Sequence, residues 1–492
     1  MSEHLPILQI VIPLISAPVC LLLRRRWLSW GFALAVSGVT LAMAATLLAR
    51  VYATGEVTYE LGGWSPPWGI EYRIDALNGF VLLLVATIAT VVLIYAPPSV
   101  AKEIPESRHY LFYTAYLLCL TGLLGVTITG DVFNLFVFLE ISALSSYVLI
   151  SLGQDRRALT AAYQYLVMGT LGATFIVIGI GLLYVVTGTL NMADMAGRLD
   201  QAGDNRTVLV AFAFLTVGIS LKAALFPLHV WLPNAYCYAP SVVTAFLAST
   251  ATKVSIYVFL RFVFTIFGRD FAFETMHLDT ILMPLALLGI FIGSIVAIFQ
   301  TNIKRMLAYS SVAQIGYMML GISFLSVTGL TGGIVHLFNH GMMKGALFLA
   351  MGCIVLRVGS SNLDDFKGLG RRMPVTMAAF VLAGLSLIGV PMTVGFVSKW
   401  YLVLAALEQG YWPVAVLILL ASLLAVAYIW RIVEVAYFQD PPEDAPVTKE
   451  APPLMQIAMW TLIAATYYFG ISTSMTTGVA RKAAEALLGV TS

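Results

Sequence analysis

The segment that decides the fold is Ile219–Pro240, which reads ISLKAALFPLHVWLPNAYCYAP. It lies within an apolar run, yet it contains Lys222, His229 and three prolines. A proline inside a helix removes a backbone donor and clashes with the preceding turn. In a bilayer, such a break is tolerated only where protein or a water-filled cavity satisfies the freed backbone groups. The segment therefore predicts a broken membrane helix that faces a hydrated, polar interior.

Apolar residues dominate the rest of the chain. Of 492 residues, 60% are hydrophobic and 11% are charged, and the mean hydropathy is +0.91. Apolar runs of about 20 residues, long enough to cross a bilayer, recur along the sequence. The start, MSEHLPILQ, lacks a basic leader region, and Arg24–Arg26 follow the first apolar run. We therefore expect a retained membrane anchor in an all-α polytopic membrane protein.

Fourteen transmembrane helices are predicted. The seventh and the twelfth are long and interrupted, at Pro227 and at GVPMTVG over Gly389–Gly395. Interrupted helices at matching places in two halves indicate internal repeats with the functional site at the breaks. Each repeat would contain five helices, an odd number, so the two repeats would be inverted relative to each other. The predicted segments are 5–23, 28–50, 75–96, 109–129, 131–152, 159–187, 207–236, 241–266, 279–299, 307–325, 329–356, 374–408, 413–438 and 454–474.

This pattern divides the chain into four parts. Residues 1–108 hold helices 1–3, residues 109–266 the first repeat (helices 4–8), residues 279–438 the second repeat (helices 9–13), and residues 439–492 a cytoplasmic loop, helix 14 and a short tail. One set of loops holds 14 Lys and Arg residues and the other set holds 7. The positive-inside rule places the richer set in the cytoplasm. We therefore expect a multi-pass protein of the cell inner membrane with both termini on the outer face.

Sequence motifs for other chemistry are missing. The chain has no Walker A loop, no dinucleotide-binding glycine fingerprint and no cluster-binding set of cysteines. Its four cysteines are far apart and indicate neither a disulfide framework nor a metal site. We expect no cofactor, no metal and no nucleic-acid partner.

Ionisable side chains lie inside the predicted membrane helices. Glu140 is nine residues after Asp131, which places it about 13–14 Å along the helix and near the centre of a roughly 30 Å hydrocarbon core. Lys253 lies mid-segment, Lys222 precedes the first break, and Lys399 follows the second. Each charge costs roughly 2.5–3.5 kcal/mol at a helix centre, so pairing or hydration must offset it. Glu140 and Lys222 are the expected ion pair.

Structural interpretations compete with a transport role for these residues. Lys222 and Lys399 could snorkel from helix ends, and Glu140 could form a static ion pair. His229, at the first break, either caps freed carbonyls or bridges two lysine-centred sites. Intramembrane ionisable groups mark ion or proton pathways by default, and we favour that interpretation.

Segment eleven carries HLFNHGMMK, in which His336, His340 and Lys344 recur every four residues. This spacing stacks them on one helix face. A His-x-x-x-His pair also suits zinc, but no glutamate follows the first histidine, no third ligand is evident, and Lys344 would repel a cation. Neutral histidine both donates and accepts a proton near neutral pH. The face is interpreted as a proton relay, with two hydrogen-bonded core histidines as the structural alternative.

Four features together resemble a known family: LKAALFPLHVWLPNAYCYAP, Glu140, Lys253 and HLFNHGMMKGALFLAMG. The family is that of the antiporter-like membrane subunits shared by Mrp-type multisubunit Na+/H+ antiporters and respiratory complex I. KAALFPLH followed by WLPNAY is most similar to the D subunit of the Mrp antiporters. The sequence GVPMTVGFVSKWYL departs from the usual PPxxGF form of the family. One complex I branch has glutamate at the last position, so Lys399 argues against that branch.

The resemblance implies a transport subunit that has no enzymatic activity of its own. It would work with other membrane subunits and move protons, with Na+ as a second candidate ion, along the membrane midplane. A proton-pumping subunit of a redox-driven complex is the alternative. The implied proton pathway consists of the coupled pair Glu140 and Lys222, the central Lys253, the relay His336 and His340, and the terminal Lys399. We add His229 and Lys344 to this pathway from their positions.

Overall fold

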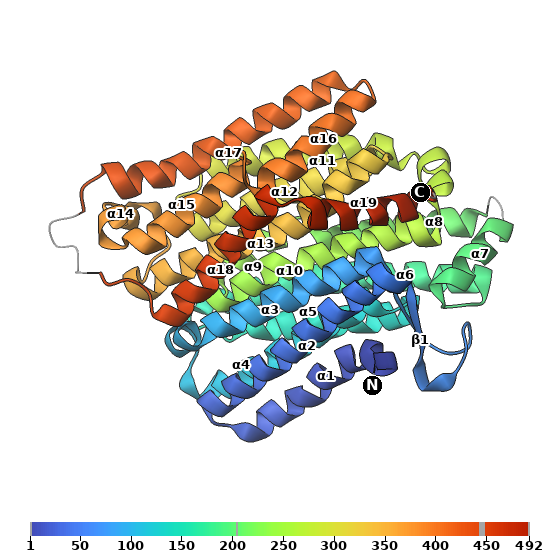
Figure 1. The fold of residues 1–492 in the computed structure, drawn as a ribbon, viewed down its shortest axis with the longest axis horizontal. Helices are drawn as coiled ribbons and strands as arrows, with labels where there is room; N and C mark the ends of the chain where they lie inside the picture. Colours follow the sequence, from blue (N-terminus) through green and yellow to red (C-terminus); the bar gives the residue numbers. More distant parts are fainter. Residues whose placement is uncertain (1, 203–204, 442–447, 491–492) are drawn as a thin grey trace.

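The structure is a computed structural model that describes residues 2–202, 205–441 and 448–490. Helices, most of them long, run side by side across one bundle (Figure 1). They are α1 (Leu5–Leu23), α2 (Arg26–Thr54), α3 (Ala76–Glu103), α4 (His109–Ile128), α5 (Val132–Ser151), α6 (Arg156–Thr187), α8 (Arg206–Ala223), α9 (Trp231–Tyr238), α10 (Ser241–Leu260), α11 (Leu278–Ile298), α12 (Ile303–Ser323), α13 (Val327–Val358), α15 (Pro374–Ile388), α16 (Val394–Glu408), α17 (Trp412–Phe438) and α18 (Pro453–Ile471).

Twelve helices among the described residues are long and apolar enough to cross a membrane. The remaining two predicted segments are occupied by α12 and by the interrupted pair α15 and α16. The predicted fold class is confirmed: the chain is a multi-pass α-helical membrane protein.

Both predicted helix breaks are confirmed. Residues 224–230 separate α8 from α9, and residues 389–393 separate α15 from α16. Ala224 (φ 57°) and Gly389 (φ 94°) adopt left-handed backbone conformations, which end the first half of each broken helix. In the first break, Pro227 also lacks the backbone donor that a continuous helix would need.

The two halves of the bundle share an order of packing. In the first, α4 packs on α5, α5 on α6, and α6 on α8 and α9; in the second, α11 packs on α12, α12 on α13, and α13 on α15 and α16. This shared order supports the division into helices 4–8 and 9–13. The four-part division and the inversion of the repeats stay predictions.

The centre of the bundle consists of α3, α4, α10, α12 and α13. The stretch Ser241–Ile266 consists of α10 and a π-helical segment, η4 (Arg261–Ile266). In its most apolar 18 residues, 94% of the residues are buried inside the protein, compared with 39% in the same length of α1, α6, α11 and α17. Polar side chains on the central helices must therefore find partners inside the protein.

Several elements outside the membrane-crossing pattern were not predicted. They are the antiparallel strands β1 (Val57–Glu60) and β2 (Glu71–Ile74), the helix α7 (Met192–Ala202) and the helix α19 (Ser474–Leu488), which lies in the predicted tail. Short charged strands and amphipathic helices leave no long apolar run, so hydropathy does not reveal them. Part of the predicted acidic loop, residues 442–447, lies outside the described residues.

The ends of the described chain lie at one end of the bundle, together with β1 and α7 (Figure 1). We call it the hairpin end. The short helix α14 (Leu369–Arg372) lies at the opposite end. The two ends of the chain thus share one side, while the assignment of that side to the cell exterior stays a prediction.

Candidate functional site

The predicted ion pair between Glu140 and Lys222 is present. Glu140 lies on α5, which begins where the Asp131 carboxylate accepts a hydrogen bond from Asn134 N at 2.7 Å. Lys222 lies in the last turn of α8, directly before the break. Its Nζ donates to Glu140 Oε1 at 3.1 Å, and the side chains of Lys222 and Glu140 are 6% and 26% exposed. The structure brings the two opposite charges together within the bundle.

Aromatic side chains fix the break beside this pair. Trp231 Nε1 donates to the Leu221 carbonyl at 3.0 Å and so adds a second hydrogen bond to an acceptor that Ala224 N also contacts at the end of α8. The Trp231 ring stacks on Tyr165 with centroids 4.0 Å apart, and Tyr147 meets Tyr165 edge-on at 4.7 Å. The position of Lys222 therefore depends on side chains from three other helices.

A small cavity of about 20 Å³ adjoins Lys222. Ser142 and Ser146 of α5 and Ser255 of α10 line it. The other lining residues include Leu123, Leu139 and Val254, so the walls are part polar and part apolar, and the volume has room for about one water molecule. It links the Glu140–Lys222 pair to α10, the helix that carries Lys253.

Lys253 is fully buried in the middle of α10. Its Nζ donates to the Ala248 carbonyl and, at 3.3 Å, to Thr252 Oγ1. Within the described ranges, Lys253 forms no ion pair with a carboxylate. Desolvation penalises the charged form of a buried amine that has no counter-charge.

The two histidines of α13 stack on each other, as their spacing predicts. The rings of His336 and His340 are parallel within 5°, with centroids 6.0 Å apart. His336 Nδ1 shares a hydrogen bond with Ser398 Oγ at 2.7 Å, which connects α13 to the residue before Lys399. His336 Nε2 and both ring nitrogens of His340 have no hydrogen-bond partner among the described residues. Three ring nitrogens of this pair are therefore available for a further hydrogen bond.

Lys344, one turn further along α13, bonds to a different helix. Its Nζ donates to the Leu307 carbonyl of α12 at 2.7 Å and to Ser310 Oγ. The residue is fully buried. No group of three potential metal ligands occurs in the part of the chain that the structure describes.

Lys399 closes the second break. Its Nζ donates to the Ile388 carbonyl at 2.7 Å and to the Leu387 carbonyl at 3.2 Å, both in the last turn of α15. It also lies 5.1 Å from the centre of the Tyr317 ring. Lys222 and Lys399 are 7% and 6% exposed, so both turn into the bundle and neither snorkels to the membrane surface.

His229 lies in the first break, where its ring stacks on Phe226 and meets Tyr309 of α12 edge-on at 6.3 Å. Its Nδ1 is buried without a partner among the described residues. The contact with Tyr309 places His229 between the two halves of the bundle. Whether His229 caps freed carbonyls or bridges two lysine-centred sites stays a prediction.

Buried polar atoms without partners among the described residues occur throughout the bundle, and some of them lie on α10, α12, α13, α15 and α17. They include Ser249 Oγ, Gln314 Oε1, Asn339 Oδ1, Ser386 Oγ and Tyr428 OH. Buried polar atoms are nearly always hydrogen-bonded, to protein or to ordered water. These atoms need ordered water or a rearranged protein group to complete their hydrogen bonds.

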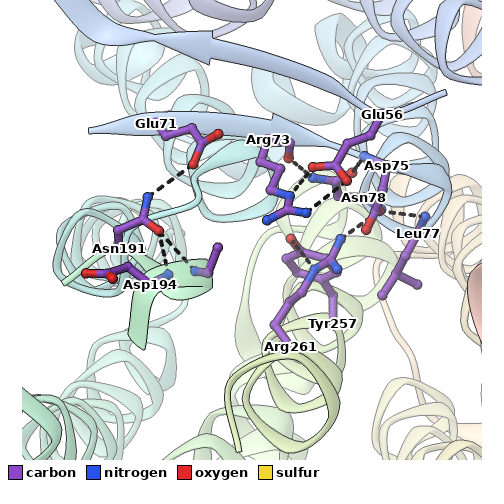
Figure 2. Close-up of polar contacts among 11 residues, drawn as sticks. Glu56, Glu71, Arg73, Asp75, Leu77, Asn78, Asn191, Asp194, Tyr257 and Arg261 are labelled. Atoms are coloured by element: carbon purple, nitrogen blue, oxygen red, sulfur yellow. Dashed lines mark hydrogen bonds and ion pairs between the residues drawn. The ribbon is translucent and has the colours of Figure 1, made fainter. Parts of the chain in front are cut away.

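A polar group at the hairpin end was not predicted from the sequence. Arg261 of η4 donates to Asp75 Oδ1 at 2.7 Å and to Tyr257 OH at 3.1 Å (Figure 2). The spacing of Lys253, Tyr257 and Arg261 could have revealed this group, because residues four apart share one face of a helix.

The sequence profile described as "NADH:quinone oxidoreductase/Mrp antiporter, TM" matches residues 129–425. The chain is 44% identical over 446 residues to the N subunit of the NADH-quinone oxidoreductase of Desulforudis audaxviator (strain MP104C), a match that covers 90% of this chain and 88% of that protein. It is 31% identical to the D subunit of the Na(+)/H(+) antiporter of Bacillus subtilis (strain 168), over 98% of this chain and 97% of that protein.

Solved structures give the same relationship. The fold matches a chain of the Mrp complex from Dietzia sp. DQ12-45-1b with a TM-score of 0.91 and 26% identity, over 99% of this chain and 97% of that one. It matches a chain of the membrane-bound sulfane sulfur reductase, an archaeal respiratory membrane complex, with a TM-score of 0.90 and 30% identity, over 99% and 98% of the two chains. The predicted resemblance is thus confirmed, and the chain belongs to the NADH:quinone oxidoreductase/Mrp antiporter family of membrane subunits.

Proposed function

We propose that this chain is the proton-translocating membrane subunit of a multisubunit monovalent cation (Na+)/proton antiporter. The observation that carries the proposal is the Glu140–Lys222 pair at one helix break, followed by buried amines and imidazoles as far as Lys399 at the other. Intramembrane ionisable groups mark proton relays. Similarity to the D subunit of a Na(+)/H(+) antiporter over nearly the whole chain supports the antiporter assignment.

The Glu140–Lys222 pair acts as a gate. While the Glu140 carboxylate is ionised and adjacent, it stabilises the Lys222 ammonium and holds the proton there. When the carboxylate moves away or is neutralised, Lys222 can release its proton through the small serine-lined cavity towards α10. The gate therefore couples a movement of α5 against α8 to the release of one proton.

The onward path runs through Lys253 and the imidazoles of His336 and His340. An imidazole accepts a proton on one nitrogen and releases one from the other. Ser398 Oγ, bonded to His336 Nδ1, is the next oxygen in line, and Lys399 follows it in the chain. His229 and Lys344 flank the path and hold charge or protons at its sides.

The antiporter would be a hetero-oligomer in the cell inner membrane, with both termini of this subunit on the outer face. Other membrane subunits supply the route for Na+ and the coupling, and this subunit carries no chemical catalysis of its own.

A redox-driven complex is the second candidate. The 44% identity to the N subunit of an NADH-quinone oxidoreductase favours it, as does the fold match to a respiratory sulfane sulfur reductase. In that case a remote electron-transfer reaction would drive the same gate.

The test uses the complex purified with its natural partners and reconstituted into vesicles that contain a pH-sensitive dye. Co-purification with small membrane subunits alone supports the antiporter; iron–sulfur or flavin proteins support the redox complex. In an antiporter, proton movement is driven by a Na+ gradient; in a redox complex, it is driven by substrate oxidation. In either complex, Glu140→Gln and Lys222→Met should each abolish it. Normal proton movement in both variants would reject a conducting role and leave a scaffold.

A further inference from the structure

A cavity of about 270 Å³ lies at the hairpin end, between the β1–β2 hairpin, the start of α3, the end of α10 and α19. We call it the hairpin pocket. Its lining includes Glu56, Glu71, Arg73, Asp75, Tyr257 and Arg261. Figure 2 shows Arg261 and Tyr257 reaching from below towards the residues of the hairpin. The proton path described above runs between the two helix breaks and assigns no role to this pocket.

The roof of the pocket is held in place by several bonds. Gly130 N donates to the Glu71 carbonyl at 2.8 Å, which ties strand β2 to the link between α4 and α5. Asn191 Nδ2 donates to Glu71 Oε2 at 3.1 Å, which ties the same residue to the start of α7. The hairpin is therefore a fixed wall of the pocket.

A charged pair closes the floor of the pocket. Arg261 Nη2 donates to Asp75 Oδ1 at 2.7 Å, and the side chains are 10% and 30% exposed. Asp75 Oδ1 also accepts from Leu77 N at 2.9 Å and Asn78 N at 3.1 Å, because Asp75 caps α3. We call this pair the latch.

A hydroxyl group lies below the latch, on the side of Lys253. Tyr257 OH accepts from Arg261 Nε at 3.1 Å and donates to the Thr127 carbonyl at 2.9 Å. Lys253, Tyr257 and Arg261 follow one another at four-residue intervals, so each step rises about 6 Å along the helix. One face of the helix thus leads from the centre of the bundle to the pocket.

Building on the proposed function, we propose that the hairpin pocket is an aqueous vestibule through which protons pass between Lys253 and the solution at the hairpin end. Tyr257 is the relaying hydroxyl. A hydronium ion in the pocket gives a proton to the Tyr257 oxygen, which releases its own proton, through water, to the neutral Lys253 amine once that amine has left the Ala248 carbonyl and turned towards Tyr257. One O–H bond breaks for each N–H bond that forms, and no electrons are transferred.

The latch leaves hopping as the way for a proton to pass the floor of the pocket. Arg261 keeps its proton at any physiological pH, so it does not take part in the relay. Its charge is paired with Asp75, and the lining holds Glu56, Glu71 and Asp75 against Arg73 and Arg261, so charge does not repel Na+ from the pocket. A proton that hops between oxygens needs no room to pass the guanidinium, whereas a metal cation does.

Access to the pocket is tested by labelling with a membrane-impermeant, charged methanethiosulfonate. The four natural cysteines are all buried, so labelling of the unsubstituted complex gives the background reactivity. Thr265→Cys, in the pocket wall, should react from the hairpin end and not from the other side. Val258→Cys, fully packed in α10 and outside the pocket, is the matched control and should stay unmodified.

The relay is tested by proton flux in reconstituted vesicles. Tyr257→Phe keeps the ring and removes the hydroxyl, and it should lower the flux by at least about tenfold, at the low end for lost proton-transfer groups. Tyr116→Phe is the matched control: it also loses one buried bond to a backbone carbonyl, at 2.9 Å, but lies on α4 away from the pocket. Tyr116→Phe should leave the flux unchanged.

Three results would overturn the vestibule: an unreactive Thr265→Cys, a modified Thr265→Cys complex with undiminished flux, or normal flux in Tyr257→Phe. Size-exclusion profiles in detergent show whether each variant assembles. Thr265→Cys is a small substitution, so its labelling is measured on a folded complex. If the unsubstituted complex moves no protons at all, the proposed function fails, while the labelling still decides whether the pocket holds solvent.

Discussion

The ammonium of Lys399 donates to the carbonyl of Ile388 at 2.7 Å and so bonds the second half of a broken helix to the end of the first. The last carbonyls of α15 have no partners within their own helix, and the negative end of the helix dipole lies there. A cation at this place donates hydrogen bonds to the free carbonyls and interacts favourably with the negative end of the dipole. The same side chain is thus a structural cap and the last proposed proton carrier, and the two roles must be separated by experiment.

Lys399→Arg separates them. Arginine can donate to the same carbonyls, but it cannot release a proton in a protein. We expect the Arg variant to assemble and melt close to the unsubstituted protein while its proton flux falls by about a hundredfold or more. The measurements are thermal unfolding in detergent and dye-monitored flux in vesicles.

Lys399→Met is the companion variant. It removes both the cap and the proton carrier, so it should lose stability as well as flux. A Lys399→Arg complex with normal flux would contradict the role of Lys399 as a proton carrier and leave only the cap.

Ser398→Ala tests the link between α13 and α16. The substitution removes the oxygen that bonds to His336 Nδ1 at 2.7 Å, and we expect proton flux to fall by about tenfold or more. Ser323→Ala is the matched control, since Ser323 Oγ is also buried but bonds to a carbonyl of its own helix at 2.8 Å. Equal flux in the two variants would show that the serine bond plays no part in transfer.

Gly395→Ala tests the packing at the second break. A Cβ atom at Gly395 would lie 1.8 Å from the Ser386 carbonyl oxygen, so the halves of the broken helix could not keep their places. We expect a loss of roughly 1–3 kcal/mol or more in stability, as for other overpacked cores. Gly181→Ala on α6, where nothing lies within 4 Å, should be neutral or slightly stabilising. A normal melting temperature for Gly395→Ala would contradict the close approach of α15 and α16.

The latch predicts a specific pH dependence of stability. Asp75 precedes the membrane-crossing part of α3; burial raises the pKa of its carboxyl, but the charge and hydrogen bond of Arg261 and the amides of Asn78 and Leu77 outweigh burial and lower the net pKa. Because the folded-state pKa is depressed, the carboxylate stabilises the fold above its unfolded pKa of about 3.9, and this is lost as the pH falls through the folded value.

Asp75→Asn should therefore melt at a lower temperature than the unsubstituted protein by an amount that is constant from about pH 8 to pH 5 and shrinks below about pH 4. Melting curves in detergent across this range are the measurement. A deficit that widens on acidification would mean that Asp75 is protonated in the folded state at neutral pH and that the latch is not an ion pair.

Sequence reasoning predicted those parts of the site that depend on one segment at a time. Prolines and glycines marked both breaks, and four-residue spacing placed His336 and His340 on one face, because these are local constraints on a helix. The Glu140–Lys222 pair could be inferred because two isolated opposite charges in a membrane need each other.

The remaining contacts join residues that are distant in the chain and chemically ordinary. Arg261 and Asp75 are 186 residues apart, and His336 and Ser398 are 62 apart. Serines and backbone carbonyls occur on every helix, so nothing local indicates which of them a buried Lys or His will meet. Only the packing of the helices selects the Ile388 carbonyl for Lys399.

The central claim is that amines buried in the membrane carry protons, and Lys253 tests it most directly because it is fully buried and forms no ion pair within the described residues. Lys253→Met keeps an unbranched side chain only one atom shorter and removes a costly buried charge, so assembly and melting temperature should be retained or improved. The decisive measurement is proton flux through the reconstituted complex of this variant. The account predicts that flux falls to the level of protein-free vesicles; flux equal to that of the unsubstituted complex would contradict it.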